Sequence, residues 1–180
     1  MRCSWAKSDL SIKYHDERWC KETHDEHTLF KMLVLEGMQA GLSWETILNK
    51  EQAYENAFDH FDYEKIASYS QEKINTLYQA EGIIHNRLKV NSIIKNAKAF
   101  IELQKEFGSF DYYIWSFVDF KPIDHHYKES KEIPASDDLS AFISKDLKKR
   151  GFKFVGPVII YSYLQAIGIY NDHLIDCEWR

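Results

Sequence analysis

The sequence predicts an all-α fold. Apolar residues recur at helical spacing along most of the chain, and only 7 Gly and 3 Pro interrupt its 180 residues, which favours long helices over many short strands. Aromatic residues make up 15% of the chain, more than a core alone requires, and indicate a lined cleft. No linker, internal repeat or low-complexity tract divides residues 1–180, so we expect a single domain.

The expected elements follow one another closely along the chain. Residues 1–25 are polar with scattered aromatic side chains, and we expect an ordered arm there rather than a helix. Helices are expected over residues 27–40, 44–58, 63–69, 71–80, 86–107, 110–118, 136–150 and 157–167. Typical N-cap residues precede or begin several of them, namely Ser43, Ser70, Asn86, Ser109 and Ser136. Residues 121–135 are polar and hold two prolines, which predicts a surface loop with His125 and His126 solvated.

The first predicted helix carries an acidic residue on its apolar face. At helical spacing Glu36 shares that face with Leu33 and Ala40, where an ionised carboxylate is costly unless it is hydrogen-bonded or neutralised. Gly41 then breaks the helix, and the large ring of Trp44 follows. This pattern indicates the wall of a pocket for a flat ligand with N–H donors. The alternative is a glutamate at the helix border that reaches solvent.

A second motif joins the last two predicted helices. Gly151 ends the first of them and Pro157 begins the second, which predicts a tight hairpin between two helices. The free amides of such a turn suit a phosphate oxygen. Lys149, Arg150 and Lys153 would supply a local positive field, although the net charge of −5 argues against broad adhesion to nucleic acid. The alternative is a plain helical hairpin with a cationic last turn.

Four possible metal ligands lie near the two ends of the chain. Cys3 and His15 belong to the polar arm, and His173 and Cys177 are spaced to share one face of a helical turn. Two thiolates and two imidazoles match the donor set of a closed structural zinc site. The sequence alone does not show that the ends meet, so a Cys3–Cys177 disulfide or unrelated roles remain alternatives.

The sequence predicts no contact with a membrane. No segment approaches the ~20 apolar residues of a transmembrane helix, and the amino terminus has no apolar signal-peptide core. We therefore expect a cytoplasmic protein.

Together these motifs resemble the 3-methyladenine DNA glycosylase I family, a branch of the helix–hairpin–helix glycosylases. The most specific matches are Glu-Gly-Met-Gln-Ala-Gly-Leu-Ser-Trp at residues 36–44 and Lys-Lys-Arg-Gly-Phe-Lys-Phe-Val-Gly at residues 148–156. Further matches lie, in order along the chain, at residues 2–5, 14–19, 82–87, 115–118 and 171–173. Cys20 departs from the pattern, since the family commonly has Gly at that position.

The resemblance implies a helix–hairpin–helix glycosylase fold with the motif at about residues 136–168 and one structural Zn²⁺ that joins the N- and C-terminal segments. It assigns the zinc ligands as Cys3, His15, His173 and Cys177. It makes Glu36 the pocket acid and assigns the aromatic walls to Tyr14, Trp19 and Trp44. It assigns DNA contacts to the gap-filling Gly41 and Leu42 and to the phosphate-binding segment with Lys149, Arg150, Gly151, Lys153, Val155 and Gly156.

The activity that the resemblance implies is hydrolytic release of N3-methylated adenine from double-stranded alkylated DNA. A monomer would flip out the damaged nucleotide and leave an abasic site. No lysine is placed to form a Schiff base, so we expect no strand cleavage, and we assign no chemical role to Asp172. The alternatives are a non-catalytic DNA-binding or damage-sensing module on the same fold and, more distantly, a zinc-stabilised helical adaptor.

Overall fold

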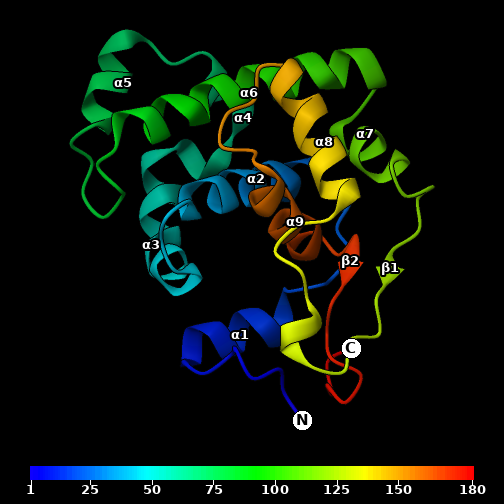
Figure 1. Ribbon diagram of the computed structural model, residues 1–180. Helices are drawn as coiled ribbons and strands as arrows, with labels where there is room; N and C mark the ends of the chain where they lie inside the picture. The colour runs from blue at the N-terminus through cyan, green and yellow to red at the C-terminus, as the bar shows by residue number, and fades with distance from the viewer.

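The computed structural model describes residues 1–180 and confirms the all-α prediction (Figure 1). The α-helices are α1 (Asp9–Glu17), α2 (Glu26–Gln39), α3 (Trp44–Ala57), α4 (Tyr63–Ala67), α5 (Gln71–Leu77), α6 (Arg87–Phe107), α7 (Phe110–Ser116), α8 (Asp138–Lys149) and α9 (Pro157–Ala166). Two 3-10 turns, η1 (Asp59–Phe61) and η2 (Ser130–Glu132), and one short parallel pairing of β1 (Ile123–Asp124) with β2 (Tyr170–Asn171) complete the fold. None of the helices combines the length and apolar character needed to cross a bilayer.

Side-chain caps begin eight of the nine α-helices. Four of the predicted caps accept a backbone N–H in the first turn, namely Ser43, Ser70, Asn86 and Ser109. The cap of α8 is Asp137 rather than the predicted Ser136, because the Asp137 carboxylate accepts from the amide of Ser140 and Ser140 bonds back to Asp137. Only α9 starts, at Gly156, without a side-chain cap.

The expectation that residues 1–25 contain no helix is wrong. Ser8 and Ser11 form a reciprocal cap at the start of α1. The helix is short and buries little besides Tyr14 and His15, so its apolar stripe is too narrow to show as a periodic pattern. Tertiary packing against α3 therefore stabilises a segment whose sequence pattern alone does not predict a helix.

The central helices α2 and α9 pack against each other and carry the core. The Tyr163 hydroxyl of α9 donates to the carbonyl of Leu29 in α2 at 3.0 Å, and both residues are fully buried. α6 lies across one end of the pair, where the Phe100 ring stacks 4.3 Å from the ring of Phe110. These contacts fix the position of α2 in the core, and with it the position of Glu36.

The two ends of the chain meet (Figure 1). The amide of Glu178 donates to the carbonyl of Met1 at 3.1 Å, and the amino group of Met1 pairs with the Glu178 carboxylate at 2.8 Å. The β1–β2 pairing fastens residues 121–135 to the C-terminal segment. The fold therefore brings the two halves of the predicted metal site together.

Candidate active site

A cavity of about 340 Å³ opens between α1, α2, α3 and α9. This volume is at the small end of the range for ligand pockets and suits a single ring system. Its walls consist of Trp5, Tyr14, Trp19, Glu36, Gln39, Trp44, Ser130, Ile133, Ser162 and Gln165. All four residues predicted for the pocket therefore line one cavity.

Glu36 is buried inside this cavity. Only 3% of the residue is exposed, so the alternative of a glutamate that reaches solvent is wrong. Burial raises the pKa of Glu36 to about 8, because no positive group compensates the loss of hydration. The carboxyl is therefore largely protonated at neutral pH in the free protein.

Three buried side-chain polar atoms have no hydrogen-bond partner in the protein, and all three belong to residues that line the cavity. They are the indole Nε1 of Trp5, the Oε2 of Glu36 and the indole Nε1 of Trp44. Buried polar atoms are nearly always paired in native proteins, since an unmade hydrogen bond costs free energy. Two donors and one carboxyl group are thus left available to a bound molecule.

Aromatic rings form the other walls of the cavity. The Tyr14 and Trp44 ring centroids lie 5.0 Å apart, and the Trp5 ring meets the Trp19 ring edge-on at 5.0 Å. Burial and the nearby Glu36 raise the pKa of Tyr14 well above its usual value, so its hydroxyl keeps its proton. The rings and the hydroxyl together suit a flat ligand that is both stacked and hydrogen-bonded.

Six of the ten residues of the cavity wall were not predicted from the sequence, namely Trp5, Gln39, Ser130, Ile133, Ser162 and Gln165. Trp5 is part of the matched segment at residues 2–5, which was a usable signal, whereas Ser130 and Ile133 lie in the segment predicted to be only a surface loop. The β1–β2 pairing draws that segment against the pocket. Gln165 was missed because it lies on α9, whose pattern predicts core packing alone.

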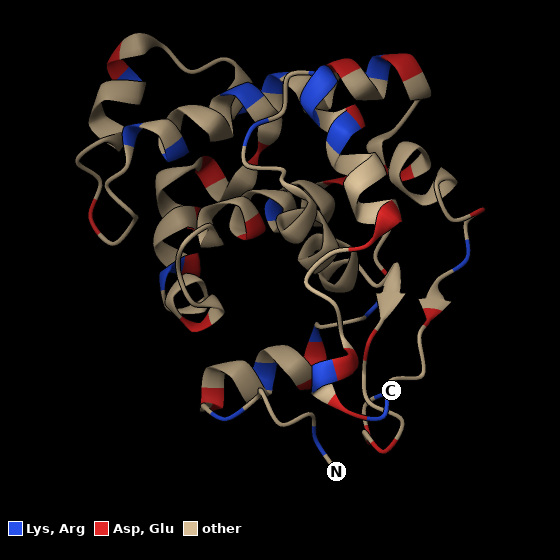
Figure 2. Ribbon diagram, viewed as in Figure 1, with Lys and Arg blue, Asp and Glu red and all other residues tan.

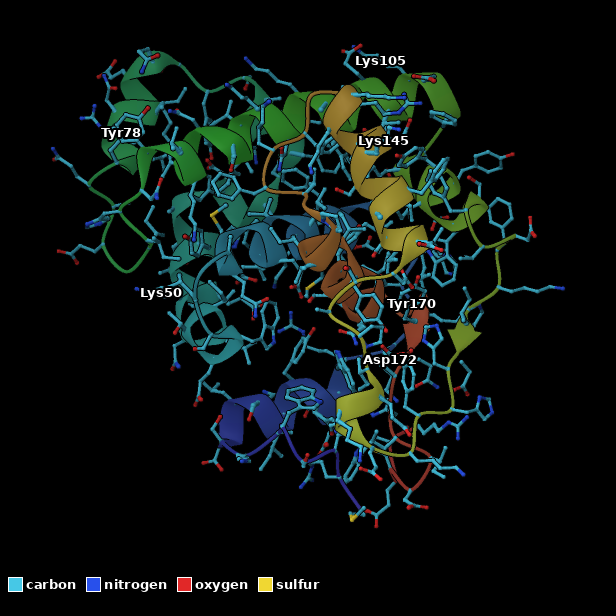
Figure 3. All side chains as sticks on the ribbon, viewed as in Figure 1. Lys50, Tyr78, Lys105, Lys145, Tyr170 and Asp172 are labelled. Carbon is cyan, nitrogen blue, oxygen red and sulfur yellow. The ribbon has the colours of Figure 1, made fainter.

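Asp172, labelled in Figure 3 where β2 ends, holds part of this wall in place. It is fully buried and accepts from the Tyr161 hydroxyl at 2.8 Å and from the Gln165 amide at 2.7 Å. The His125 ring contacts its other oxygen at 2.6 Å, so His125 is not solvated as predicted. Asp172 therefore anchors neighbouring side chains within the protein, and Gln165 is the one that reaches the cavity.

A cluster of Cys3, His15, His173 and Cys177 lies behind the cavity. All four are buried, and their candidate ligand atoms lie within 4.8 Å of one another. The Cys177 sulfur lies 3.3 Å from His173 Nδ1 and 3.6 Å from His15 Nε2, and the Cys3 sulfur lies 3.8 Å from His173 Nδ1. All three cysteines are free thiols, so the structure does not form the alternative Cys3–Cys177 disulfide.

The donor set of this cluster fits a tetrahedral zinc ion. Zinc–sulfur and zinc–nitrogen bonds of usual length place neighbouring S and N ligands about 3.5 Å apart, close to the observed separations. His15 Nδ1 contacts the Asp16 carboxylate at 2.7 Å and His173 Nε2 contacts the Trp19 carbonyl at 3.2 Å, which fixes both rings. Burial lowers the pKa of His15 and lowers that of His173 to about 4, so both imidazoles are neutral, as metal ligands must be.

The segment between α8 and α9 is a tight turn with unused amides. Gly151 ends α8 with φ +94°, a left-handed conformation that suits glycine. The amides of Phe154, Val155 and Gly156 donate no hydrogen bond within the protein, and they precede the uncapped start of α9. The Val155 side chain is buried, so only its backbone is available to a partner.

The three cations predicted for this turn differ in their surroundings. Lys149 and Lys153 are exposed. The Arg150 guanidinium instead pairs with Glu106 at 2.6 Å and Asp146 at 2.7 Å. Figure 2 shows basic residues of α8 and α6 gathered at the same end of the molecule. Two of the three predicted cations are therefore free to meet an anion, while Arg150 ties α8 to α6.

The turn between α2 and α3 carries the two residues predicted to fill a gap in DNA. Gly41 has φ +78° and is exposed, and the Leu42 residue is 40% exposed. They lie between Gln39 and Trp44 in the chain, and both of those residues line the cavity. This turn therefore lies at the rim of the pocket.

Cys20 follows the aromatic wall residue Trp19 with φ +58°, in the left-handed region. This conformation is easiest for glycine, the residue that the family resemblance implies at this position. Its amide donates to the Gln165 carbonyl at 3.0 Å, so the turn keeps its place despite the substitution.

A helical body with one buried carboxyl among aromatic walls, beside an uncapped helix start flanked by lysines, has the architecture of a DNA glycosylase. The chain belongs to the methyladenine glycosylase family, whose model matches residues 5–180.

Relatives of known name match the chain over nearly its whole length. The DNA-3-methyladenine glycosylase of Haemophilus influenzae is 42% identical over 180 residues, which is 99% of this chain and 97% of that protein. DNA-3-methyladenine glycosylase 1 of Escherichia coli K12 is 44% identical over 177 residues, 98% of this chain and 95% of that protein. A crystal structure of a 3-methyladenine DNA glycosylase I variant in complex with 3-methyladenine superposes with a TM-score of 0.96 at 40% identity, covering 99% and 96% of the two chains.

Proposed function

We propose that this chain is a monofunctional DNA-3-methyladenine glycosylase. It flips an N3-methylated adenine out of double-stranded DNA and hydrolyses its glycosidic bond, acting as a monomer and a single domain. The observation that carries this proposal is the set of three unpartnered polar atoms in one aromatic cavity, on Trp5, Glu36 and Trp44. The homologues named for the same lesion support it.

Recognition rests on the charge of the lesion. An adenine nucleotide alkylated at N3 is cationic, and a cation beside Glu36 favours the ionised carboxylate, so binding displaces the proton that the buried group holds when free. The carboxylate then accepts hydrogen bonds from the base edge while Tyr14, Trp19 and Trp44 form the rings around it. An unmodified, neutral base would not compensate the cost of ionising Glu36.

The chemical step needs little from the protein. The positive charge on the base weakens its bond to the sugar, so the base leaves as a neutral molecule without being protonated. The bond electrons go to the base, the sugar passes through an oxocarbenium-like transition state, and water adds to its C1′ carbon and loses a proton. Glu36 holds the base in the orientation in which it leaves the sugar, and the aromatic walls restrict other orientations of the base.

DNA contacts in this proposal come from two turns. The free amides of residues 154–156, with Lys149 and Lys153, bind a backbone phosphate in the manner of a helix–hairpin–helix motif. Gly41 and Leu42 enter the space that the extruded base leaves in the duplex. Arg150 has no direct role in this proposal, because its guanidinium is engaged by Glu106 and Asp146.

One structural Zn²⁺ would be held by Cys3, His15, His173 and Cys177, whose separations and neutral imidazoles fit that ion. When bound it supplies a rigid tetrahedral link between the ends of the chain. The Trp19 ring packs 4.8 Å from the His173 ring and also lines the cavity, so this link would steady one pocket wall.

The test is to incubate the purified protein with methylated duplex DNA and identify any released base by chromatography. We expect 3-methyladenine to be freed and an intact strand with an abasic site to remain. The alternative, a non-catalytic damage-sensing module, predicts salt-dependent DNA binding without release of any base. Release of no base by the folded, zinc-loaded protein would refute the enzymatic proposal.

A further inference from the structure

α6 carries three buried polar side chains that the reaction described above does not use. Ser92 bonds within its own helix to the Lys89 carbonyl, whereas Lys89 and Asn96 reach other segments. Lys89 is 6% exposed and Asn96 is 3% exposed. They are seven residues apart, which places them on the same face of the helix about 10 Å from one another. Each bonds to the backbone of a different turn that is proposed to touch DNA.

The Lys89 ammonium binds the end of the pocket helix α2. Its Nζ donates to the carbonyl of Met38 at 2.7 Å and to that of Ala40 at 2.8 Å, and it makes no ion pair. A cation in the first turn of α6 is unfavourable for that helix. It is favourable for the carbonyl end of α2, which has no basic residue in its own last turn.

These two bonds fix the point at which the chain leaves α2. Ala40 is the C-cap residue, and Gly41 and Leu42 follow it at once. Within the turn, the Leu42 amide donates to the Gln39 carbonyl at 2.7 Å. Because both residues of the turn are exposed, packing does not hold it, and the Lys89 bonds are its main link to the body of the protein.

Asn96 does the same for the turn between α8 and α9. Its amide donates to the Lys153 carbonyl at 2.9 Å and its oxygen accepts from the Lys153 amide at 2.8 Å. The next residue, Phe154, has φ +54° and packs against Gly37 of α2, where an added Cβ would lie 3.3 Å from the Phe154 carbonyl oxygen. The turn is therefore held from α6 and pressed against the pocket helix.

We infer that α6 acts as a strut that sets the position of the residue 41–42 turn relative to the α8–α9 turn, with Lys89 and Asn96 as positioning residues. A helix of 21 residues that is packed along its length resists bending, so the two turns keep one spacing. That spacing matters because, under the proposed function, one turn holds a phosphate while the other fills the gap left by the flipped base. The inference therefore rests on the proposed function for its effect on excision.

Lys89→Met tests the first positioning residue, and Lys98→Met on the exposed face of the same helix is the matched control. We expect Lys89→Met to lower release of 3-methyladenine from duplex DNA at least tenfold. Release from single-stranded methylated DNA, which leaves no gap between paired strands, and affinity for free 3-methyladenine should stay within twofold of wild type. An equal loss in all three assays, or no loss beyond that of Lys98→Met, overturns the role of Lys89.

Asn96→Leu tests the second positioning residue, with Asn75→Leu on exposed α5 as the control. We expect the affinity for a duplex containing a stable abasic-site analogue to fall about tenfold, because the turn loses the two hydrogen bonds that hold Lys153 to α6. The affinity for free 3-methyladenine should not change. Unchanged duplex affinity, or an equal loss of free-base affinity, overturns this part of the inference.

Amide hydrogen exchange in the DNA-free protein tests, independently of activity, whether Lys89 holds the residue 41–42 turn in place. Exchange at the Leu42 amide, which donates to the Gln39 carbonyl, should be several-fold faster in Lys89→Met than in wild type and unchanged in Lys98→Met. Equal exchange in wild type and Lys89→Met overturns the inference even if the protein is an active glycosylase. Conversely, a wild-type protein that frees no base defeats the proposed function, while faster exchange in Lys89→Met still supports the tether.

Discussion

The cavity and the Cys/His cluster lie on either side of Trp19. Each contains buried polar side chains, Glu36 in the cavity and His15 and His173 in the cluster, whose removal from water costs free energy. In the cluster, each imidazole has one nitrogen fixed by the protein, His15 by Asp16 and His173 by the Trp19 carbonyl. In the cavity, Glu36 Oε2 has no partner in the protein at all. The difference indicates that the cluster is organised to stabilise the fold and the cavity to receive a ligand.

The largest expected effect lies in the cluster. Cys177→Ala removes one of four proposed zinc ligands and should lower the free energy of unfolding by on the order of 5–10 kcal/mol, since metal binding contributes directly to folding. Chemical unfolding and elemental analysis measure this, with about one zinc per wild-type chain expected. Cys20→Ala is the control, since that thiol lies outside the cluster. A wild-type protein that contains no metal and is no more stable than Cys177→Ala would contradict the zinc assignment.

The next effect is a loss of stability as the pH rises, and it comes from the cavity. Burial raises the folded-state pKa of Glu36 to about 8, above its usual value of 4.5, so its contribution to stability is full below pH 4.5 and is lost as the pH rises through 8. The loss amounts to at most about 5 kcal/mol. Glu36→Gln should remove it, so the variant becomes more stable relative to wild type as the pH rises.

Denaturant unfolding of wild type and Glu36→Gln between pH 5 and pH 8.5 measures this difference. Glu72→Gln, on an exposed position of α5, should follow the wild-type curve. Parallel curves for wild type and Glu36→Gln would show that the carboxyl has an ordinary pKa.

On activity, Glu36→Gln should have a large effect while leaving the protein folded. It replaces a charged acceptor with a neutral amide, and hydrogen bonds to charged groups contribute about 1.5–3 kcal/mol, so release of 3-methyladenine should fall roughly 10- to 150-fold. Single-turnover release from methylated duplex DNA is the measurement, and Glu72→Gln should retain full activity. Wild-type rates in Glu36→Gln would exclude Glu36 as the recognition group.

The smallest effect concerns the DNA-facing turn. Lys149→Gln should weaken DNA binding a few-fold for all sequences and reduce the slope of log affinity against log salt by about one, because one phosphate contact is lost. Arg150→Gln should change that slope less and the stability more, since Arg150 is paired with Glu106 and Asp146. Fluorescence anisotropy at several salt concentrations separates the two, and equal slopes for both variants would contradict the distinction.

Local patterns in the sequence were enough to predict most helices. The structure confirms the apolar repeat of α6, the caps at Ser43 and Asn86 and the helix stop at Gly151. Each of these features depends on neighbouring residues alone, which is why the sequence could predict it. The failures share one cause. α1 and the segment with Ser130 and Ile133 have weak patterns of their own and take their conformation from distant partners, such as α3 and the β1–β2 pairing.

The sequence by itself determined the helical class, the family resemblance and the residue types that form the pocket and the Cys/His cluster. Only the tertiary structure decided that the chain ends meet, that Glu36 lies in a cavity with unpartnered indoles, and that Arg150 is engaged internally while Lys149 is free. The physical reason is the distance along the chain over which each interaction acts. Helix propensity and capping act over a few residues, whereas burial, pKa and ligand geometry depend on segments that only folding brings together.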